Sequence, residues 1–262
     1  KQRVTKELAK LVGSTPDQIA ITRNATESLD LVISGFPWQK GDEAIYAKQD
    51  YGTMKEMIEQ ISDRYGVINK IISVPNHPKS DEEIVSLYES QITKKTKLIM
   101  VCHMINITGQ ILPIKKICEM AHSHGVEVMV DGAHCVGMFD FSIDDLNCDY
   151  YGSSLHKWLA TPLGAGLLYV NKNKTHKIWP LLANGITDKT DIRRLNHIGT
   201  HPVHTDLAIS NSIDYLNWIG IKRKEERMRF LQRYWSDKLR NTNNVVVNTP
   251  EDINRSCGIG NV

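Results

Sequence analysis

Apolar residues along this chain alternate between helical spacing and short continuous runs. Helices are predicted over residues 4–12, 24–35, 53–65, 81–92, 113–124, 206–219 and 222–233. Strands are predicted over residues 18–22, 43–47, 67–74, 97–102, 126–130, 150–153 and 166–170. Because the strands alternate with helices long enough to cross back over a sheet, we expect an α/β fold. The expected architecture is three-layer α/β/α, with a doubly wound, mainly parallel sheet.

The composition is that of a globular protein with balanced charge. Of the 262 residues, 41% are hydrophobic and 24% are charged, with 32 basic and 30 acidic side chains. This balance gives no electrostatic reason to expect binding to nucleic acid or to an anionic membrane. No apolar run approaches the roughly 20 residues that span a bilayer, and the first residues do not resemble a secretion signal. We therefore expect a soluble protein of the cytoplasm.

Cysteines and histidines do not form a metal-binding pattern. The five cysteines are odd in number and lack paired zinc-type spacing, which favours reduced, mostly buried thiols. His197, His201 and His204 lie close together in the sequence, but no cysteine or paired carboxylate accompanies them. We therefore predict no metal site.

Two segments that follow predicted strands carry the most reactive side chains. Asp131 and His134 follow one strand, and Ser154, His156 and Lys157 follow the next. Ligands in such sheets bind beyond the carboxyl ends of the strands, so Asp131 and Lys157 could reach one ligand. A lysine amine among apolar neighbours can attack a carbonyl, and an aspartate can keep a pyridinium nitrogen protonated. Taken alone, Asp131 could instead cap a helix.

The pattern Asp-x-Ala-His at residues 131–134, followed by Ser-x-His-Lys at 154–157, resembles the pyridoxal-phosphate site of the class V aminotransferase family. That family includes cysteine desulfurases and isopenicillin N epimerase-like enzymes, which have a fold-type I large domain. The resemblance implies that Lys157 forms a Schiff base with pyridoxal 5'-phosphate and then moves a proton at the substrate's alpha carbon. It also implies that Asp131 pairs with the ring nitrogen, that His134 bonds the phenolic oxygen, and that Ser154 and His156 bind the phosphate.

The same resemblance assigns cofactor contacts to other strand ends. Ala25 and Thr26 would face the phosphate at a helix start, where Asn24 is either a cap or a substrate contact. Tyr51 would cover the pyridine ring, although by sequence alone such a tyrosine is more often a surface or core residue. Asn106 would reach the phenolic oxygen or the substrate, while nearby His103 is expected to be a structural histidine.

The C-terminal part of the chain resembles the family only in part. Gly199-Thr200 is similar to a segment that crosses to a partner subunit, which implies a homodimer in which Thr200 binds the partner's cofactor phosphate. We expect a large domain over residues 1–205. Residues 206–262 would form a connecting helix and the start of an incomplete small α+β domain, with a strand beginning near Cys257. The ligand of the substrate carboxylate is expected in the family's missing C-terminal part.

Trp158-Leu159, followed by Pro162, Gly164 and Gly166, resembles the epimerase-like branch more than the desulfurases. The first hypothesis is therefore an epimerase-like enzyme acting at the alpha carbon of an amino acid or amino-acid-derived substrate. The second is a cysteine desulfurase, carbon–sulfur lyase or aminotransferase on the same scaffold. Cys257 is not expected to be a desulfurase nucleophile, since the family's reactive cysteine lies on a later loop. The third is a non-catalytic binding protein, against which the intact Lys157 and Asp131 argue.

Overall fold

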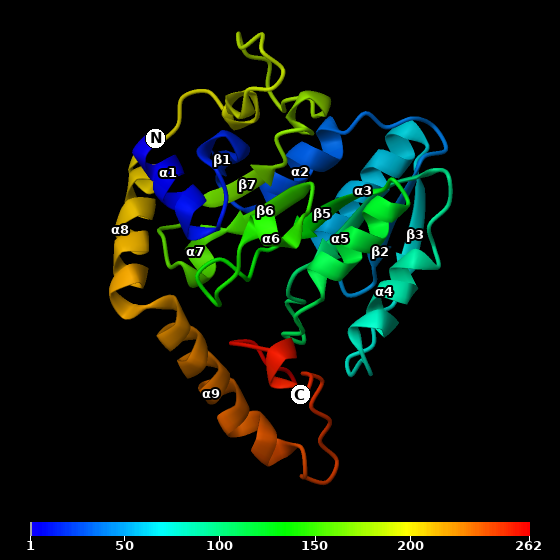
Figure 1. Cartoon of the computed structure of the whole chain (residues 1–262), viewed down its shortest axis with the longest axis vertical. Coiled ribbons are helices and arrows are strands. Elements are labelled where there is room, and N and C mark those ends of the chain that lie inside the picture. Colours follow the sequence, from blue (N-terminus) through cyan, green and yellow to red (C-terminus); the bar gives the residue numbers. More distant parts are fainter. Residues whose placement is uncertain (1) are drawn as a thin grey trace.

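The computed structural model describes residues 2–262, in which seven strands form one sheet of order β1-β7-β6-β5-β4-β2-β3 (Figure 1). The strands are β1 (Ile19–Thr22), β2 (Glu43–Ala47), β3 (Ile68–Ile72), β4 (Thr96–Cys102), β5 (Glu127–Asp131), β6 (Tyr150–Ser154) and β7 (Gly166–Val170). Neighbouring strands in the series β3, β2, β4, β5 and β6 pair in parallel, whereas β7 runs antiparallel to both β6 and β1. The predicted α/β fold with a mainly parallel sheet is confirmed.

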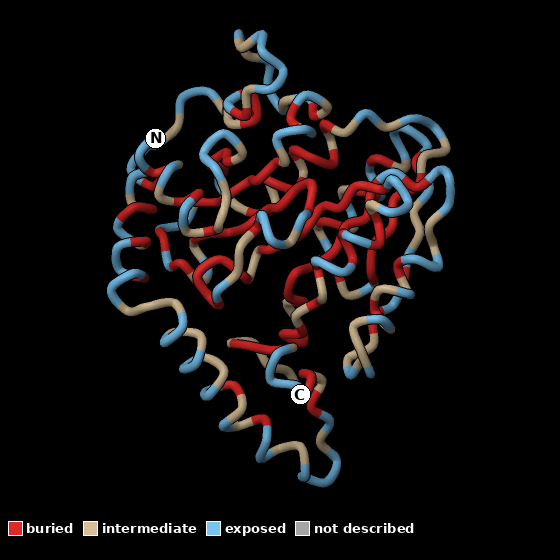
Figure 2. The backbone as a smooth tube through the Cα atoms, viewed as in Figure 1, coloured by how far each residue is buried: buried red, intermediate tan, exposed pale blue. Residues whose placement is uncertain are grey.

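Helices cover both faces of this sheet. The helices are α1 (Gln2–Leu11), α2 (Ala25–Gly35), α3 (Gly52–Tyr65), α4 (Asp81–Glu89), α5 (Ile114–Ser123), α6 (Ile143–Leu146), α7 (Leu155–Trp158), α8 (His204–Ile219) and α9 (Ile221–Leu239). Buried residues of α1, α4, α5 and α8 form one core with one face of the sheet, and those of α2 and α3 form a second core on the other face. Within β5, Val128 and Val130 belong to the first core and Met129 to the second, as the alternation of side chains along a strand requires. Figure 2 shows the buried backbone concentrated in the sheet between these layers.

Local chemistry explains where α2 begins. Asn24 has an extended backbone, and its Oδ1 accepts a hydrogen bond from the amide of Glu27 at 2.8 Å. The Glu27 carboxylate in turn accepts from the amide of Arg23 at 2.6 Å. These bonds satisfy amides that have no partner within the helix, so the helix starts directly after β1 and points its N-terminus at the sheet edge.

Several element boundaries differ from the prediction. β3 is shorter than the predicted 67–74, because this edge strand has one buried residue and pairs only with β2. α9 runs on to Leu239, six residues beyond the predicted end at Arg233. The strand expected near Cys257 is wrong: residues 256–262 pair with no strand in the described part of the chain, and the amide of Asn248 instead donates to the Asn261 carbonyl at 2.9 Å.

α9 projects away from the sheet, and the C-terminal segment returns between α9 and the main body (Figure 1). Arg255 ties this segment to α4 through an ion pair with Asp81 at 2.5 Å. Asn76 holds it through a hydrogen bond to Asn248 at 3.2 Å. The division into domains at residues 205 and 206 stays a prediction.

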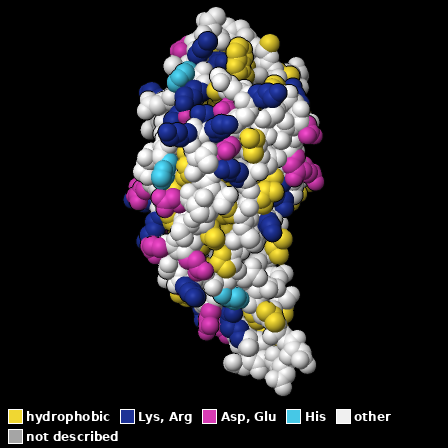
Figure 3. All heavy atoms as spheres, turned by 90° about the vertical axis from the view of Figure 1, so that its right-hand side faces the viewer, with side chains coloured by type: hydrophobic (Ala, Val, Ile, Leu, Met, Phe, Trp, Pro, Cys, Tyr) yellow, Lys and Arg dark blue, Asp and Glu magenta, His cyan; other side chains and the backbone are white. Residues whose placement is uncertain are grey.

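The surface mixes charges of both signs. Figure 3 shows Lys and Arg side chains interspersed with Asp and Glu over one face of the molecule. Among the described helices, none is both long and apolar enough to cross a bilayer.

Candidate active site

A cavity of about 230 Å³ opens at the carboxyl edge of the parallel strands. Nine of the ten predicted site residues line it: Ala25, Thr26, Tyr51, Asn106, Asp131, His134, Ser154, His156 and Lys157. They come from five separate segments, at or just after the carboxyl ends of β1, β2, β4, β5 and β6. The tenth, Thr200, does not line this cavity. The fold therefore brings together residues that are up to 132 positions apart in the chain (157 − 25 = 132).

Asp131 is a buried acid at the end of β5. Its side chain accepts a hydrogen bond from the amide of Ala133 at 3.0 Å. Burial raises the pKa of Asp131, against the opposing effects of that amide and of the Lys157 charge. A buried carboxylate with one backbone partner leaves lone pairs for a cationic donor from a ligand, which would offset its desolvation.

Lys157 and His134 both line the cavity, and their side chains are in contact. The Nζ of Lys157 lies 3.0 Å from the Nε2 of His134, whose Nδ1 accepts from the indole Nε1 of Trp158 at 3.2 Å. Burial lowers the pKa of Lys157, although the charge of Asp131 opposes this effect. Burial, with a smaller contribution from Lys157, lowers the pKa of His134 to about 4. The imidazole is therefore neutral at pH 7, and the amine is easier to deprotonate than a surface lysine.

The start of α2 and the end of β6 form one wall of the cavity. The Oγ of Ser154 accepts from the amide of Ala25 at 2.9 Å, which fixes the first turn of α2 against β6. The first-turn amides of a helix lack intrahelical acceptors and favour negative charge. The Nδ1 of His156 is buried without a hydrogen-bond partner among the described residues. A ligand with several acceptor oxygens would suit this wall.

Asp50 lies next to the cavity and stabilises the strand ends that line it. From the sequence, no role was assigned to this residue. It is buried and accepts from the amide of Ala47 at 2.7 Å and from that of Cys102 at 3.2 Å. These bonds join the ends of β2 and β4 and place Tyr51 at the cavity mouth, where it is 48% exposed. Burial raises the pKa of Asp50 to about 6. The signal in the sequence was an acidic residue just after a buried strand, beside the aromatic residue singled out there.

His103 and Tyr151 pack beneath the segment that follows β5. The Nδ1 of His103 lies 3.0 Å from the Tyr151 hydroxyl, and both residues are buried. A Cβ at Gly132 would lie 2.0 Å from the Tyr151 ring, so only glycine allows this approach. His103 is therefore a structural histidine with a hydrogen-bond partner, as expected.

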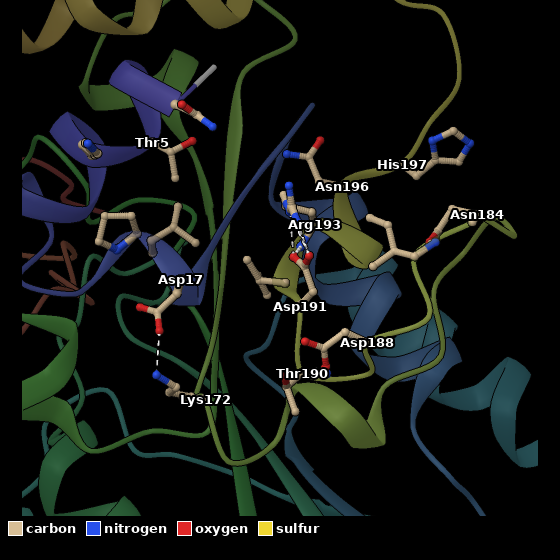
Figure 4. Close-up of a pocket in the computed structure, with 17 residues that line it drawn as sticks. Thr5, Asp17, Lys172, Asn184, Asp188, Thr190, Asp191, Arg193, Asn196 and His197 are labelled. Atoms are coloured by element: carbon tan, nitrogen blue, oxygen red, sulfur yellow. Dashed lines mark hydrogen bonds and ion pairs between the residues drawn. The ribbon is translucent and has the colours of Figure 1, made fainter.

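A larger cavity, of about 1130 Å³, lies at the opposite edge of the sheet, where β1 begins and β7 ends (Figure 4). Four of its charged side chains form two ion pairs. Lys172 pairs with Asp17 at 2.9 Å, and Arg193 pairs with Asp191 at 2.5 Å. None of the predicted site residues lines it, so the candidate chemistry lies in the smaller cavity.

The model of the class-V aminotransferase family matches residues 2–262 of this chain. The chain belongs to this family. The strand ends that carry Asp131 and Lys157 both lie within the matched region.

The chain is similar to isopenicillin N epimerases and to cysteine desulfurases. It is 28% identical over 231 residues to isopenicillin N epimerase from Streptomyces clavuligerus, covering 82% of this chain and 58% of the epimerase. It is 29% identical over 254 residues to the epimerase from Amycolatopsis lactamdurans, covering 89% and 63%. A probable cysteine desulfurase from Halalkalibacterium halodurans is 27% identical over 251 residues, covering 91% and 61%. The chain thus spans about six tenths of the length of these relatives.

Solved structures of the same fold include two related enzymes. A C-DES mutant with glycine covalently linked to its PLP cofactor superposes with a TM-score of 0.87 at 21% identity, covering 99% of this chain and 70% of that one. The apo cysteine desulfurase from Thermococcus onnurineus NA1 superposes with a TM-score of 0.85 at 22% identity, covering 100% and 67%. At these identities the comparison establishes the shared fold.

Proposed function

We propose that this protein is a pyridoxal-5'-phosphate-dependent enzyme that acts at the alpha carbon of an amino acid or amino-acid-derived substrate. Lys157 would attach the cofactor covalently. The reaction on the substrate would be isopenicillin N epimerase-like. The observation that carries the proposal is the 3.0 Å approach of the Lys157 amine to His134, in one cavity with the buried carboxyl of Asp131. Family membership and the epimerase relatives support it.

The residues of the cavity fit this cofactor. The first turn of α2, with Ala25 and Thr26, would hold the phosphate together with Ser154 and His156. The unpartnered Nδ1 of His156 would gain an acceptor there. Buried Asp131 matches a protonated ring nitrogen, since the two opposite charges offset each other's desolvation. Tyr51 would cover the ring at the cavity mouth, and Asn106 and His134 would lie near the phenolic oxygen. When bound, the cofactor supplies an electron sink for charge that develops at the alpha carbon.

Lys157 would serve both as the covalent anchor and as the group that moves a proton at the alpha carbon. Both roles require a neutral amine, which the lowered pKa of Lys157 favours. Asp131 would keep negative charge beside the ring nitrogen and so favour its protonated form. Asp50 would act only through the strand ends that it joins.

The epimerase-like reaction is proposed ahead of a desulfurase reaction because the relatives at 28% and 29% identity are isopenicillin N epimerases. The five cysteines of the chain are buried free thiols. Burial raises the pKa of Cys257 to about 11, so it is a poor nucleophile. Cys102 lines the cavity, but burial raises its pKa well above the usual range, so it is a poor nucleophile as well. The similarity to cysteine desulfurases keeps carbon–sulfur cleavage as the second candidate reaction, with transamination as a further variant.

We further propose a homodimer in which Thr200 of each chain completes the partner's phosphate site. The position of Thr200 outside the cavity of its own chain is compatible with this arrangement. Five unpaired thiols are also compatible with the reducing cytoplasm, where we place the protein.

The test uses the full-length protein. It should be yellow, and borohydride reduction followed by peptide mapping should label Lys157. Lys157→Ala should be colourless, whereas Lys172→Ala, which removes a surface lysine, should stay yellow. Labelling at another lysine would refute the assignment. A panel of amino acids then separates the reactions: deuterium uptake with inverted configuration indicates epimerisation, sulfide release indicates cleavage, and an oxo-acid product indicates transamination.

A further inference from the structure

Trp158 lies next to Lys157 in the sequence and contacts His134 in space. Its indole Nε1 donates to the Nδ1 of His134 at 3.2 Å, while the Nε2 of the same imidazole lies 3.0 Å from the Lys157 amine. The ring of His134 thus has a defined partner on each nitrogen. The sequence pointed to Trp158 only as a feature of the epimerase-like branch.

The chemistry of these partners determines the proton on His134. An indole N–H can only donate, so the Nδ1 that faces it must carry a lone pair. The pKa of His134 is lowered to about 4, so the ring is neutral and has one proton, which must then be on Nε2. The Nε2–H consequently donates to Lys157, and only an unprotonated amine can accept it. The network therefore matches the lowered pKa of Lys157.

We propose that Trp158 is a positioning residue that holds His134 in the Nε2–H tautomer, with its donor directed into the cavity. The tautomer of His134 follows from the contacts of its ring. Only the identity of the ligand that accepts from Nε2–H rests on the proposed function. A phenolic oxygen on the ligand would accept from Nε2–H. The other tautomer would present a lone pair to that oxygen and repel it.

Trp158 is itself held by two parts of the chain. A Cβ at Gly137, which has φ +82°, would lie 2.9 Å from the Trp158 carbonyl carbon, so only glycine lets the His134 segment approach this closely. On its other side the indole packs against the apolar cluster that contains Cys257, against which Met228 of α9 also packs. The Trp158 carbonyl accepts a hydrogen bond from the Nζ of Lys224. α9 and the C-terminal segment therefore help to fix the orientation of the indole, and through it that of His134.

The experiment is nitrogen-15 NMR of histidine-labelled, cofactor-free full-length protein, with His134→Gln used to assign the resonances. The wild type should show an unprotonated Nδ1 and a protonated Nε2 at pH 7. Trp158→Phe removes the donor and keeps an aromatic ring. In that variant part of the population should change to the Nδ1–H tautomer, so the Nδ1 resonance should move to higher field. The titration midpoint of His134 should rise by about one pH unit, since one hydrogen bond to the neutral form is lost.

The matched control is Trp38→Phe. Trp38 donates its indole N–H to the Ile33 carbonyl at 2.8 Å, far from His134 in the fold, so this variant should leave both readouts unchanged. A protonated Nδ1 in the wild type, or equal midpoints in Trp158→Phe and wild type, would overturn the proposal. If Trp158→Phe does not fold, 3-benzothienylalanine at position 158 replaces the N–H by sulfur with nearly the same shape. Because no cofactor is present, failure of cofactor binding cannot change these results.

Discussion

The hydroxyl of Ser154 accepts a hydrogen bond from the amide of Ala25 at 2.9 Å, although the two residues are 129 positions apart in the sequence. This bond joins the end of β6 to the start of α2, where the proposed phosphate site lies. Ser154→Ala removes this acceptor and one proposed phosphate ligand together. A hydrogen bond to a charged oxygen contributes about 1.5–3 kcal/mol, so cofactor affinity should fall roughly tenfold or more in equilibrium titrations.

Ser28→Ala is the matched control for this prediction. Ser28 is also buried, and its hydroxyl donates to the Leu167 carbonyl at 2.9 Å, but it does not line the cavity. It should lose stability, by about 1 kcal/mol, and keep its affinity for the cofactor. Equal losses of affinity in the two variants would mean that Ser154 acts through the fold alone.

Asp131→Asn tests the proposed pairing with the ring nitrogen. The amide has nearly the same size and can still accept from Ala133, so the variant should fold and bind the cofactor. Loss of the charge beside the ring nitrogen should lower turnover by roughly 100-fold or more. The control Asp149→Asn alters a buried acid that accepts from the Val128 amide, outside the cavity, and its folded fraction should keep normal turnover. Unchanged turnover in Asp131→Asn would refute the role.

His103 predicts how stability depends on pH. Burial lowers its pKa from 6.5 to about 3, so below pH 6.5 the unfolded chain binds a proton that the folded chain does not. This contribution to stability is complete above pH 6.5 and is lost as the pH falls. Between pH 6.5 and 4.5 the loss is about 2 kcal/mol. His103→Gln should reduce the dependence of the free energy of unfolding on pH, as measured by denaturant unfolding. Part of this dependence should remain, because the pKa of His134 is also lowered.

The control for the pH prediction is His124→Gln. His124 is a partly exposed histidine that pairs with Glu89 at 3.0 Å on the protein surface. Comparison with this variant separates the loss of a buried imidazole from the loss of any one histidine. A slope that is identical in His103→Gln and wild type would show that the buried imidazole is not the group that couples stability to pH.

The elements that the sequence predicted well are those with local markers. Asn24 caps α2 with its own side chain, and Gly125, with φ +72°, ends the turn after α5. The direction of β7 has no such marker, because the buried run Gly166–Val170 has the same pattern in parallel and antiparallel pairing. The edge position of β3 likewise depends on which strands lie beside it.

The residues of the site likewise differ in whether the sequence marks them locally. Asp131 and Lys157 could be located because each follows a buried strand and carries reactive chemistry at a known sheet edge. Asp50 and Trp158 could not, because their roles consist of contacts with the Cys102 amide and the His134 ring, which only the folded chain brings near.

The last prediction concerns Thr200 and the proposed homodimer. If Thr200 bonds the cofactor phosphate of the partner subunit, Thr200→Val should weaken cofactor binding roughly tenfold or more, since a hydrogen bond to a charged group is lost. Dilution of the wild type should also release cofactor, because binding and dimerisation are then linked. If Thr200 instead lies in a local turn before Pro202, its loss should hardly affect the cofactor.

Mixed dimers separate these two arrangements. A Thr200→Val subunit paired with a Lys157→Ala subunit has one site with a lysine, and that site would receive Thr200 from its partner. Its affinity should equal that of the wild type. In the reciprocal control, a wild-type subunit is paired with one that carries both substitutions, so the site with a lysine lacks the crossing threonine and should bind weakly. The opposite order of affinities would place Thr200 in its own subunit's site, because each dimer contains one copy of each side chain and differs only in which subunit supplies it.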